Sequence, residues 1–291
     1  MKPVAFDYVA AESLDDAVSA LAGAGGDGKI LAGGQSLVPM LNFRLVRPSI
    51  LIDINRIRDL GYVEATGDVV RIGALTRHHL LETSPVIKAH LPVMTAAMQH
   101  VAHLAVRNRG TIGGSLSHAD PAAELPMMAV LLDAKIGIRS LHGRRMAEAG
   151  RFFTGSLTTD LKRDEIVTDV EFPRLLPNTG WAFEEMARRA GDFALAAVGV
   201  TMSAREGKAD RIRIGMMGVG ETPLRAPEAE ALLAGKAIDT HAVEAAASAI
   251  EAVVEPNSDL HASADYRRVL VGALARRAIS AAWQRACGAS P

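Results

Sequence analysis

Two short glycine turns carry the clearest chemical signal in the sequence. The first covers residues 32–37 (AGGQSL) after a strand-like run, and the second covers residues 111–115 (TIGGS). Because glycine has no Cβ, successive backbone N–H groups can converge on an anion, and Gln, Ser and Thr add uncharged donors. The pair predicts a site for the two phosphates of a dinucleotide. Either turn alone is more typical of a tight turn that needs a positive φ, because Gly-Gly is common in loops.

A third glycine cluster, residues 23–28 (GAGGDG), matches the string G-x-G-x-x-G. The dinucleotide fingerprint requires a strand before the glycines and a helix after them, because the pyrophosphate lies at the N-terminus of that helix. Here a helical pattern comes first and a strand-like run follows. The segment is therefore predicted to end a helix and form a flexible turn.

Composition excludes several classes of protein. Of the 291 residues, 49% are hydrophobic and 22% charged, which excludes broad disorder. The net charge of -1 argues against nucleic-acid binding, which requires a basic surplus. Cys287 is the one cysteine, so this chain alone cannot close a disulfide or ligate an iron–sulfur cluster. The sequence offers neither a signal-peptide core nor an apolar run near the roughly 20 residues of a membrane span, and a cytoplasmic location is expected.

Periodicity predicts an α+β protein in two parts. Residues 1–176 mix helices and strands, with a hairpin across residues 67–68 and a helical pattern over residues 76–106. Asp120 and Pro121 predict the start of a helix that runs towards Asp133. Residues 177–291 begin with three β-type stretches and continue into Ala-rich helices; the stretches are 181–188, 194–204 and 211–219, and the helices are 227–234, 240–254 and 264–286.

Four longer segments carry a resemblance to a known family. They are residues 32–45 (AGGQSLVPMLNFRL), 111–126 (TIGGSLSHADPAAELP), 187–194 (ARRAGDFA) and 258–268 (SDLHASADYRR). Together they resemble the flavoprotein medium subunit of the molybdenum hydroxylases, the family of aerobic carbon monoxide dehydrogenase and of the xanthine dehydrogenase flavin domain. The resemblance implies an FAD-binding fold of the vanillyl-alcohol-oxidase type over residues 1–176, with two α/β subdomains that divide near residues 55–60. It also implies a C-terminal domain with a small antiparallel sheet and a helical layer.

The resemblance also implies contacts with FAD. Both glycine turns are placed around the pyrophosphate, and further residues are placed against the flavin or beside it. Glu185 (or Glu184) stands where relatives often carry Lys, and Gln35 stands where many carbon monoxide dehydrogenase subunits have His. The complete set is Ala32, Gly33, Gly34, Gln35, Ser36, Leu37, Val101, Ala102, Thr111, Gly113, Gly114, Ser115, Glu124, Ile166 (or Val167) and Glu185.

The implied function is electron transfer by FAD. Substrate is hydroxylated at a molybdopterin cofactor in a large partner subunit, and 2Fe–2S clusters of a small partner subunit pass the electrons to this chain. No catalytic residue and no metal ligand is expected here. Two alternatives stay open, a self-sufficient flavin oxidase or dehydrogenase and a non-catalytic nucleotide-binding or assembly module. The substrate, the final electron acceptor and the stoichiometry also stay open.

Other polar residues carry weaker signals. His100 and His103 are three residues apart, but a metal site needs further ligands. The histidine pair 78–79 is predicted as a solvated helix start. The arginine pairs 188–189 and 267–268 are predicted as solvated surface, with contact to a partner or to the adenine end of FAD as the alternative.

Overall fold

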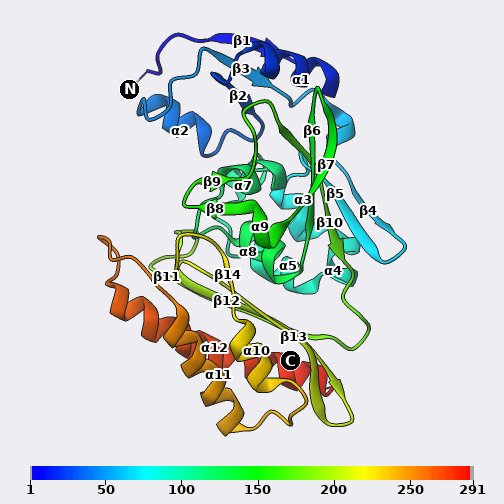
Figure 1. Ribbon diagram of the computed structural model, residues 1–291, viewed down its shortest axis with the longest axis vertical. Coiled ribbons are helices and arrows are strands. Elements are labelled where there is room, and N and C mark those ends of the chain that lie inside the picture. Colours follow the sequence, from blue (N-terminus) through cyan, green and yellow to red (C-terminus); the bar gives the residue numbers. More distant parts are fainter. Residues whose placement is uncertain (1, 289–291) are drawn as a thin grey trace.

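The computed structural model describes residues 2–288 and contains three sheets of three or more strands, which follow one another along the molecule (Figure 1). We call the parts built on them the N-terminal, middle and C-terminal units. The N-terminal unit lies at one end of the long axis and the C-terminal unit lies at the other. Among the described residues, no helix has the length and apolar character needed to cross a membrane.

The N-terminal unit is a parallel sheet of three strands in the order β1-β3-β2, which are β1 (Asp7–Ala10), β3 (Ile50–Asp53) and β2 (Gly28–Leu31). Helix α1 (Leu14–Gly23) connects β1 to β2, and α2 (Leu37–Asn42) follows the first glycine turn. The Ser13 hydroxyl accepts a hydrogen bond from the N–H of Asp16, whose carboxylate accepts from the N–H of Ser13. This capping box fixes where α1 begins. The segment 23–28 ends the helix and turns, as predicted.

The middle unit is an antiparallel sheet in the order β4-β5-β10-β6-β7, with helices packed against it. The predicted hairpin across residues 67–68 is confirmed. The strands are β4 (Val63–Thr66), β5 (Val69–Gly73), β10 (Ile166–Pro173), β6 (Lys135–Ser140) and β7 (Gly143–Glu148), with a small hairpin of β8 (Phe153–Gly155) and β9 (Thr158–Thr159). The helices are η1 (Arg58–Leu60), α3 (His78–Thr83), α4 (Pro85–His90), α5 (Pro92–Met98), α6 (Leu104–Arg107), α7 (Ile112–His118), α8 (Glu124–Leu131) and α9 (Ala149–Phe152).

Two predictions for this unit were wrong in detail. The helical pattern over residues 76–106 is four short helices, because Pro85 and Pro92 each start a new helix and Ala102 turns the chain at φ 40°. Asp120 does not cap a helix: its carboxylate accepts from the N–H of Ala122 in a turn, and α8 begins only at Glu124. All eight residues of α8 are buried.

The C-terminal unit is an antiparallel sheet in the order β11-β12-β13-β14 between two layers of helix. Helix α8 packs on one face, where Gly199 and Gly215 leave room for Met127 and Leu131. Helix α12 covers the other face, and Gly180 lets the backbone near Ala282 approach closely. The elements are β11 (Gly180–Ala187), β12 (Ala194–Arg205), β13 (Lys208–Met217), β14 (Leu224–Arg225), α10 (Pro227–Leu233), α11 (Thr240–Val253) and α12 (Ala264–Ala286).

Candidate functional site

The first glycine turn packs against the residues that lead into the second, although the two turns belong to different units. The first glycine turn (residues 32–37) joins β2 to α2, and the second (residues 111–115) opens α7. A Cβ added to Gly33 would overlap the carbonyl oxygen of Arg109 and lie 2.9 Å from the Cα of Gly110. A Cβ added to Gly114 would lie 3.9 Å from the Cβ of Ala32. The backbones therefore meet at a distance that requires glycine at position 33.

In the first glycine turn, consecutive backbone N–H groups are available to a ligand. The N–H groups of residues 33–37 have no hydrogen-bond acceptor among the residues that the structure describes. Gly34 has a φ of 74°, which bends the backbone in a way that side chains rarely allow. Consecutive N–H groups around such a bend form a concave anion-binding surface.

The second glycine turn differs from the first in its donors. The N–H groups of Ile112 and Gly113 donate to the carbonyl oxygens of Thr76 and Ala74, and that of Gly114 donates to the Thr111 hydroxyl at 3.2 Å. Their backbone donors are therefore committed to the fold. Gly113 lies against Ala74, which a Cβ would overlap at 2.6 Å. What this turn offers an anion is hydroxyl chemistry, from Thr111 and Ser115, rather than free N–H groups.

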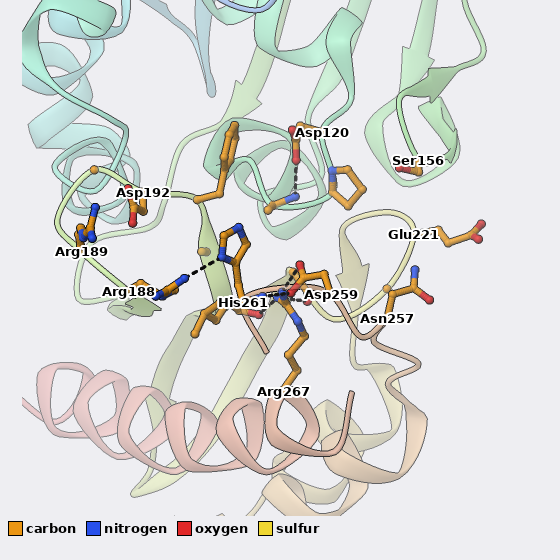
Figure 2. A pocket seen from close by; sticks show the side chains of 18 residues that line it. Asp120, Ser156, Arg188, Arg189, Asp192, Glu221, Asn257, Asp259, His261 and Arg267 are labelled. Carbon is orange, nitrogen blue, oxygen red and sulfur yellow. Dashed lines mark hydrogen bonds and ion pairs between the residues drawn. The ribbon is translucent and has the colours of Figure 1, made fainter. Parts of the chain in front are cut away.

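A cavity of about 750 Å³ lies beyond the other end of α7, between the middle and C-terminal units (Figure 2). Its walls come from the turn before α8, the β8–β9 hairpin, the β11–β12 loop, the β13–β14 loop and the segment before α12. Three of the four segments that carry the family resemblance therefore meet here: 111–126, 187–194 and 258–268. The fourth segment contains the first glycine turn.

Arg267 forms the base of this cavity and is only 6% exposed. Its guanidinium donates to the carbonyl oxygen of Leu195 at 2.5 Å, to that of Gly218 at 3.3 Å and to the Asp259 carboxylate at 2.7 Å. Backbone N–H groups near His261 also donate to Asp259 and lower its pKa to about 2. The prediction that Arg267 is solvated surface was wrong: the residue ties three loops of the cavity wall together.

The opposite rim of the cavity is formed by the β11–β12 loop. Arg188 lies 3.0 Å from Nδ1 of His261, and Figure 2 shows these side chains facing each other across the cavity edge. Phe193, in the same loop, is 70% exposed. An exposed aromatic ring beside a cavity is a candidate for packing against a flat ligand.

Val101 and Ala102 lie in the turn between α5 and α6, against this loop. A Cβ on Gly191 would lie 3.2 Å from the carbonyl carbon of Ala102. Arg107 donates to the carbonyl oxygens of Val101 and Ala102 at 2.8 and 2.9 Å, which holds the left-handed backbone of Ala102 in place. The structure thus places the turn that holds these two residues behind the β11–β12 loop, and neither residue lines the cavity itself.

Glu124 and Glu185 are both buried where the middle and C-terminal units meet. The Glu185 side chain is 2% exposed, lies 3.7 Å from Nδ1 of His100, and its Oε2 has no hydrogen-bond partner among the described residues. Burial, with a smaller effect of the nearby Glu124 charge, raises the pKa of Glu185 to about 8. Burial likewise raises the pKa of Glu124 to about 7. Neither residue lines the cavity itself.

Ile166 lies apart from the other predicted residues. It is 3% exposed at the start of β10 and packs in the core between the N-terminal and middle units, with Leu60 and Leu75. Val167, the alternative, lies in the core of the middle unit. The structure places neither side chain in the cavity.

Several cavity residues were not predicted from the sequence as site residues; they include Ser156, Asp192, Phe193, Asp259 and His261, together with Asp120, which was predicted only as a helix start. Most lie in loops, where no periodicity marks them. Arg267 did carry a signal, because it shares the helical phase of Leu270, Val271 and Leu274, which form the buried stripe of α12.

Two family models match nearly the whole chain. The FAD binding domain in molybdopterin dehydrogenase matches residues 4–175, and the CO dehydrogenase flavoprotein C-terminal domain matches residues 181–282. The chain therefore belongs to the FAD-binding flavoprotein subunits of the molybdopterin dehydrogenases. The resemblance drawn from the sequence segments is confirmed.

Individual relatives cover almost the full length. The 6-hydroxypseudooxynicotine dehydrogenase complex subunit alpha of Paenarthrobacter nicotinovorans is 42% identical over 98% of this chain and 97% of its own. A solved carbon monoxide dehydrogenase from Hydrogenophaga pseudoflava superposes with a TM-score of 0.96 at 41% identity, covering 98% of this chain and 99% of that one. Quinoline 2-oxidoreductase from Pseudomonas putida 86 gives a TM-score of 0.93 at 39% identity, covering 98% and 100%.

Proposed function

We propose that this chain is the electron-transfer subunit of a molybdenum hydroxylase complex and that it carries FAD between its glycine turns and its cavity. In the complex it accepts electrons from the 2Fe–2S clusters of a small partner subunit and passes them to an external acceptor. A large partner subunit holds the molybdopterin cofactor and hydroxylates the substrate. The observation that carries the proposal is the contact of the two glycine turns, with free N–H groups at residues 33–37, close to a cavity walled by the family segments.

The donors at the glycine turns fit a diphosphate. Free N–H groups of the first glycine turn and the hydroxyls of Ser36, Thr111 and Ser115 supply uncharged hydrogen bonds without a lysine. A Cβ at Gly33 would occupy the space between the turns. The fit is therefore one of close backbone approach rather than charge pairing.

The cavity fits the flavin end of the same molecule. Its volume of about 750 Å³ is within the usual range for cofactor pockets. Helix α7, with seven residues, separates it from the turns by roughly 10 Å at about 1.5 Å per residue. One dinucleotide bound along α7 would reach both places.

Within this proposal the cofactor contacts are those that the resemblance implies. They are Ala32, Gly33, Gly34, Gln35, Ser36, Leu37, Val101, Ala102, Thr111, Gly113, Gly114, Ser115, Glu124, Ile166 and Glu185. The fold is of the vanillyl-alcohol-oxidase type, with an FAD-binding domain over residues 1–176, divided near residues 55–60, and a second domain over residues 177–291. We place the complex in the cytoplasm.

Bound FAD supplies an acceptor that takes up two electrons and releases them one or two at a time. The work of the chain is to hold this group in one orientation and leave one edge accessible. Residues 33–37 bind by backbone donors, and Arg267 fixes the loops around the cavity through Leu195 and Gly218. No residue of this chain is assigned a proton transfer.

The names of the relatives indicate that the medium subunit does not select the substrate. Relatives between 37% and 42% identical are named for 6-hydroxypseudooxynicotine, carbon monoxide, nicotine, glyceraldehyde and caffeine. Similar medium subunits thus serve complexes with very different substrates. We expect the large partner subunit to select the substrate here as well.

The first experiment identifies the flavin. The purified chain is precipitated with acid, and the supernatant is separated by chromatography. Release of FAD supports the proposal, because two glycine turns suit a diphosphate. Release of FMN would overturn the assignment of a diphosphate. No flavin after reconstitution would overturn the proposed function and favour a non-catalytic nucleotide-binding or assembly module.

The second experiment tests electron transfer. The flavin-loaded chain is mixed with its molybdenum and iron–sulfur partner subunits and substrate without oxygen, and bleaching of the flavin band is followed. We expect reduction only with both partners present. Rapid reduction of the isolated chain by substrate would instead support a self-sufficient oxidase.

A further inference from the structure

Asn55 and Arg77 form a bridge between the two glycine turns. The side-chain amide of Asn55 donates to the carbonyl oxygen of Ala32 at 2.8 Å, in the first glycine turn. Nη2 of Arg77 donates to Oδ1 of Asn55 at 2.7 Å, and its Nη1 donates to the carbonyl oxygen of Arg109. The path therefore runs from one glycine turn to the residue pair that precedes the other.

The Asn55 side chain is held in one orientation. Oδ1 of Asp53 accepts from its side-chain amide at 2.6 Å and from its backbone N–H at 2.8 Å. Oδ2 of Asp53 accepts from the Tyr8 hydroxyl at 2.7 Å. Burial opposes ionisation of Asp53, but the hydrogen bonds from Tyr8 and Asn55 prevail and lower its pKa. An ionised Asp53 accepts only, so Asn55 must direct its NH2 group towards Ala32 and its oxygen towards Arg77.

The bridge crosses from one unit to another. Asn55 follows β3 in the N-terminal unit, whereas Arg77 immediately precedes α3 in the middle unit, which lies beneath that sheet (Figure 1). A backbone bridge between Arg77 and Thr111 ties the arginine directly to the second glycine turn. Two turns on separate units need such a tie, since a diphosphate binds both only at one spacing.

We propose that the Asn55–Arg77 pair sets the spacing of the two glycine turns and thereby the affinity for the dinucleotide. This inference rests on the proposed FAD site. Each terminal nitrogen of Arg77 donates to a protein oxygen that belongs to or leads to one of the turns, so in this proposal the arginine is a positioning residue that acts through the turns.

The test compares flavin affinities of full-length variants after removal of bound flavin. Arg77→Met, Asn55→Ala and the double variant are titrated with FAD and with ADP, followed by flavin fluorescence or by competition. Arg77→Lys keeps the positive charge but has one donor nitrogen instead of three, so it should have an intermediate effect on affinity. Arg58→Met is the matched control, because Arg58 is exposed and makes no side-chain hydrogen bond among the described residues.

We expect Arg77→Met and Asn55→Ala each to raise the dissociation constants for FAD and ADP by about 10-fold or more, with Arg77→Lys between parent and Arg77→Met. Since the pair acts as one unit, the double variant should lose little more than the worse single variant. The control should match the parent. Thermal melts of the apo-proteins separate folding from spacing, and if Arg77→Met does not fold, Arg77→Lys and Asn55→Ala decide.

Parent-like affinities in the folded variants would overturn the inference, and so would fully additive losses in the double variant. A parent chain that binds neither FAD nor ADP would instead overturn the proposed function, so the two failures are distinguishable.

Discussion

Oε1 of Glu185 lies 3.7 Å from Nδ1 of His100, too far for a hydrogen bond, while the other oxygen of the same buried carboxyl has no partner among the described residues. Burial lowers the pKa of His100 and raises that of Glu185 to about 8. The pair is therefore neutral near pH 7 rather than an ion pair. A neutral carboxyl at this junction makes the stability of the fold depend on pH.

We predict that Glu185→Gln stabilises the protein above neutral pH. The folded pKa of about 8 exceeds the ordinary value of 4.5, so the folded state binds the proton more tightly. Proton binding to Glu185 therefore stabilises the folded state. This contribution to the free energy of unfolding is complete below the ordinary pKa and is lost as pH rises through the folded pKa. Glutamine cannot ionise, so the gain in melting temperature should be larger at pH 9 than at pH 6. Glu184→Gln is the control, because Glu184 is paired with Arg277 at 2.8 Å; an equal pH-dependent gain there would contradict the prediction.

Gly33→Ala should weaken flavin binding, with little effect on the rest of the fold. Its Cβ would overlap the backbone of Arg109 and Gly110, which cannot yield as a flexible side chain would. The two glycine turns must then separate. We expect the dissociation constant for FAD, measured by fluorescence titration, to rise by about 10-fold or more. Gly150→Ala is the matched control, because its Cβ would meet nothing within 4 Å. Retained affinity in Gly33→Ala would show that the turns need no close contact.

Arg267 and Arg268 are adjacent in sequence but should respond very differently to truncation. Arg267→Met leaves the carbonyl oxygens of Leu195 and Gly218 without their donor, at a cost of about 1–3 kcal/mol in the free energy of unfolding. Arg268 pairs with the exposed Asp265, and Arg268→Met should cost less than about 0.5 kcal/mol. Urea denaturation measures both. Equal costs would mean that the buried network does not hold the cavity wall.

Thr111→Val should weaken the second glycine turn. The Thr111 hydroxyl caps α7 by accepting from the N–H of Gly114, and loss of such a cap costs about 1 kcal/mol. We expect a lower melting temperature together with reduced flavin content after purification. Thr83→Val is the control, because the Thr83 hydroxyl donates to the carbonyl oxygen of His79 and caps no helix start. Full flavin content in Thr111→Val would show that this hydroxyl does not contribute to flavin binding.

The sequence predicted long periodic elements well and short interrupted ones poorly. Helix α12 was predicted with its observed bounds, because 23 residues contain many turns of one apolar stripe. The region from α3 to α6 was read as one helical pattern, because four helices of seven residues or fewer keep a similar local composition. Their breaks depend on Pro85, Pro92 and the left-handed Ala102, which are local backbone events.

For the site, the glycine turns were visible in the sequence, but their contact was not. That contact joins Gly33 to Arg109 across a gap of 76 positions and exists only because two units pack together. Burial of Arg267 and exposure of Phe193 likewise depend on loops that fold back over the cavity. Residue type alone favours the opposite for both, since arginine is usually exposed and phenylalanine buried.

The burial of α8 on every side has a consequence for how a cofactor enters. This helix packs against α5 on one side and against β12 and β13 on the other. It therefore belongs to the cores of both units that flank the cavity. Opening the cavity by swinging those units apart would expose an apolar helix and the glycine-lined sheet that receives it. A hinge is therefore costly here. We expect a large planar ring to enter and leave through the mouth of the existing cavity, while the two units stay packed on α8.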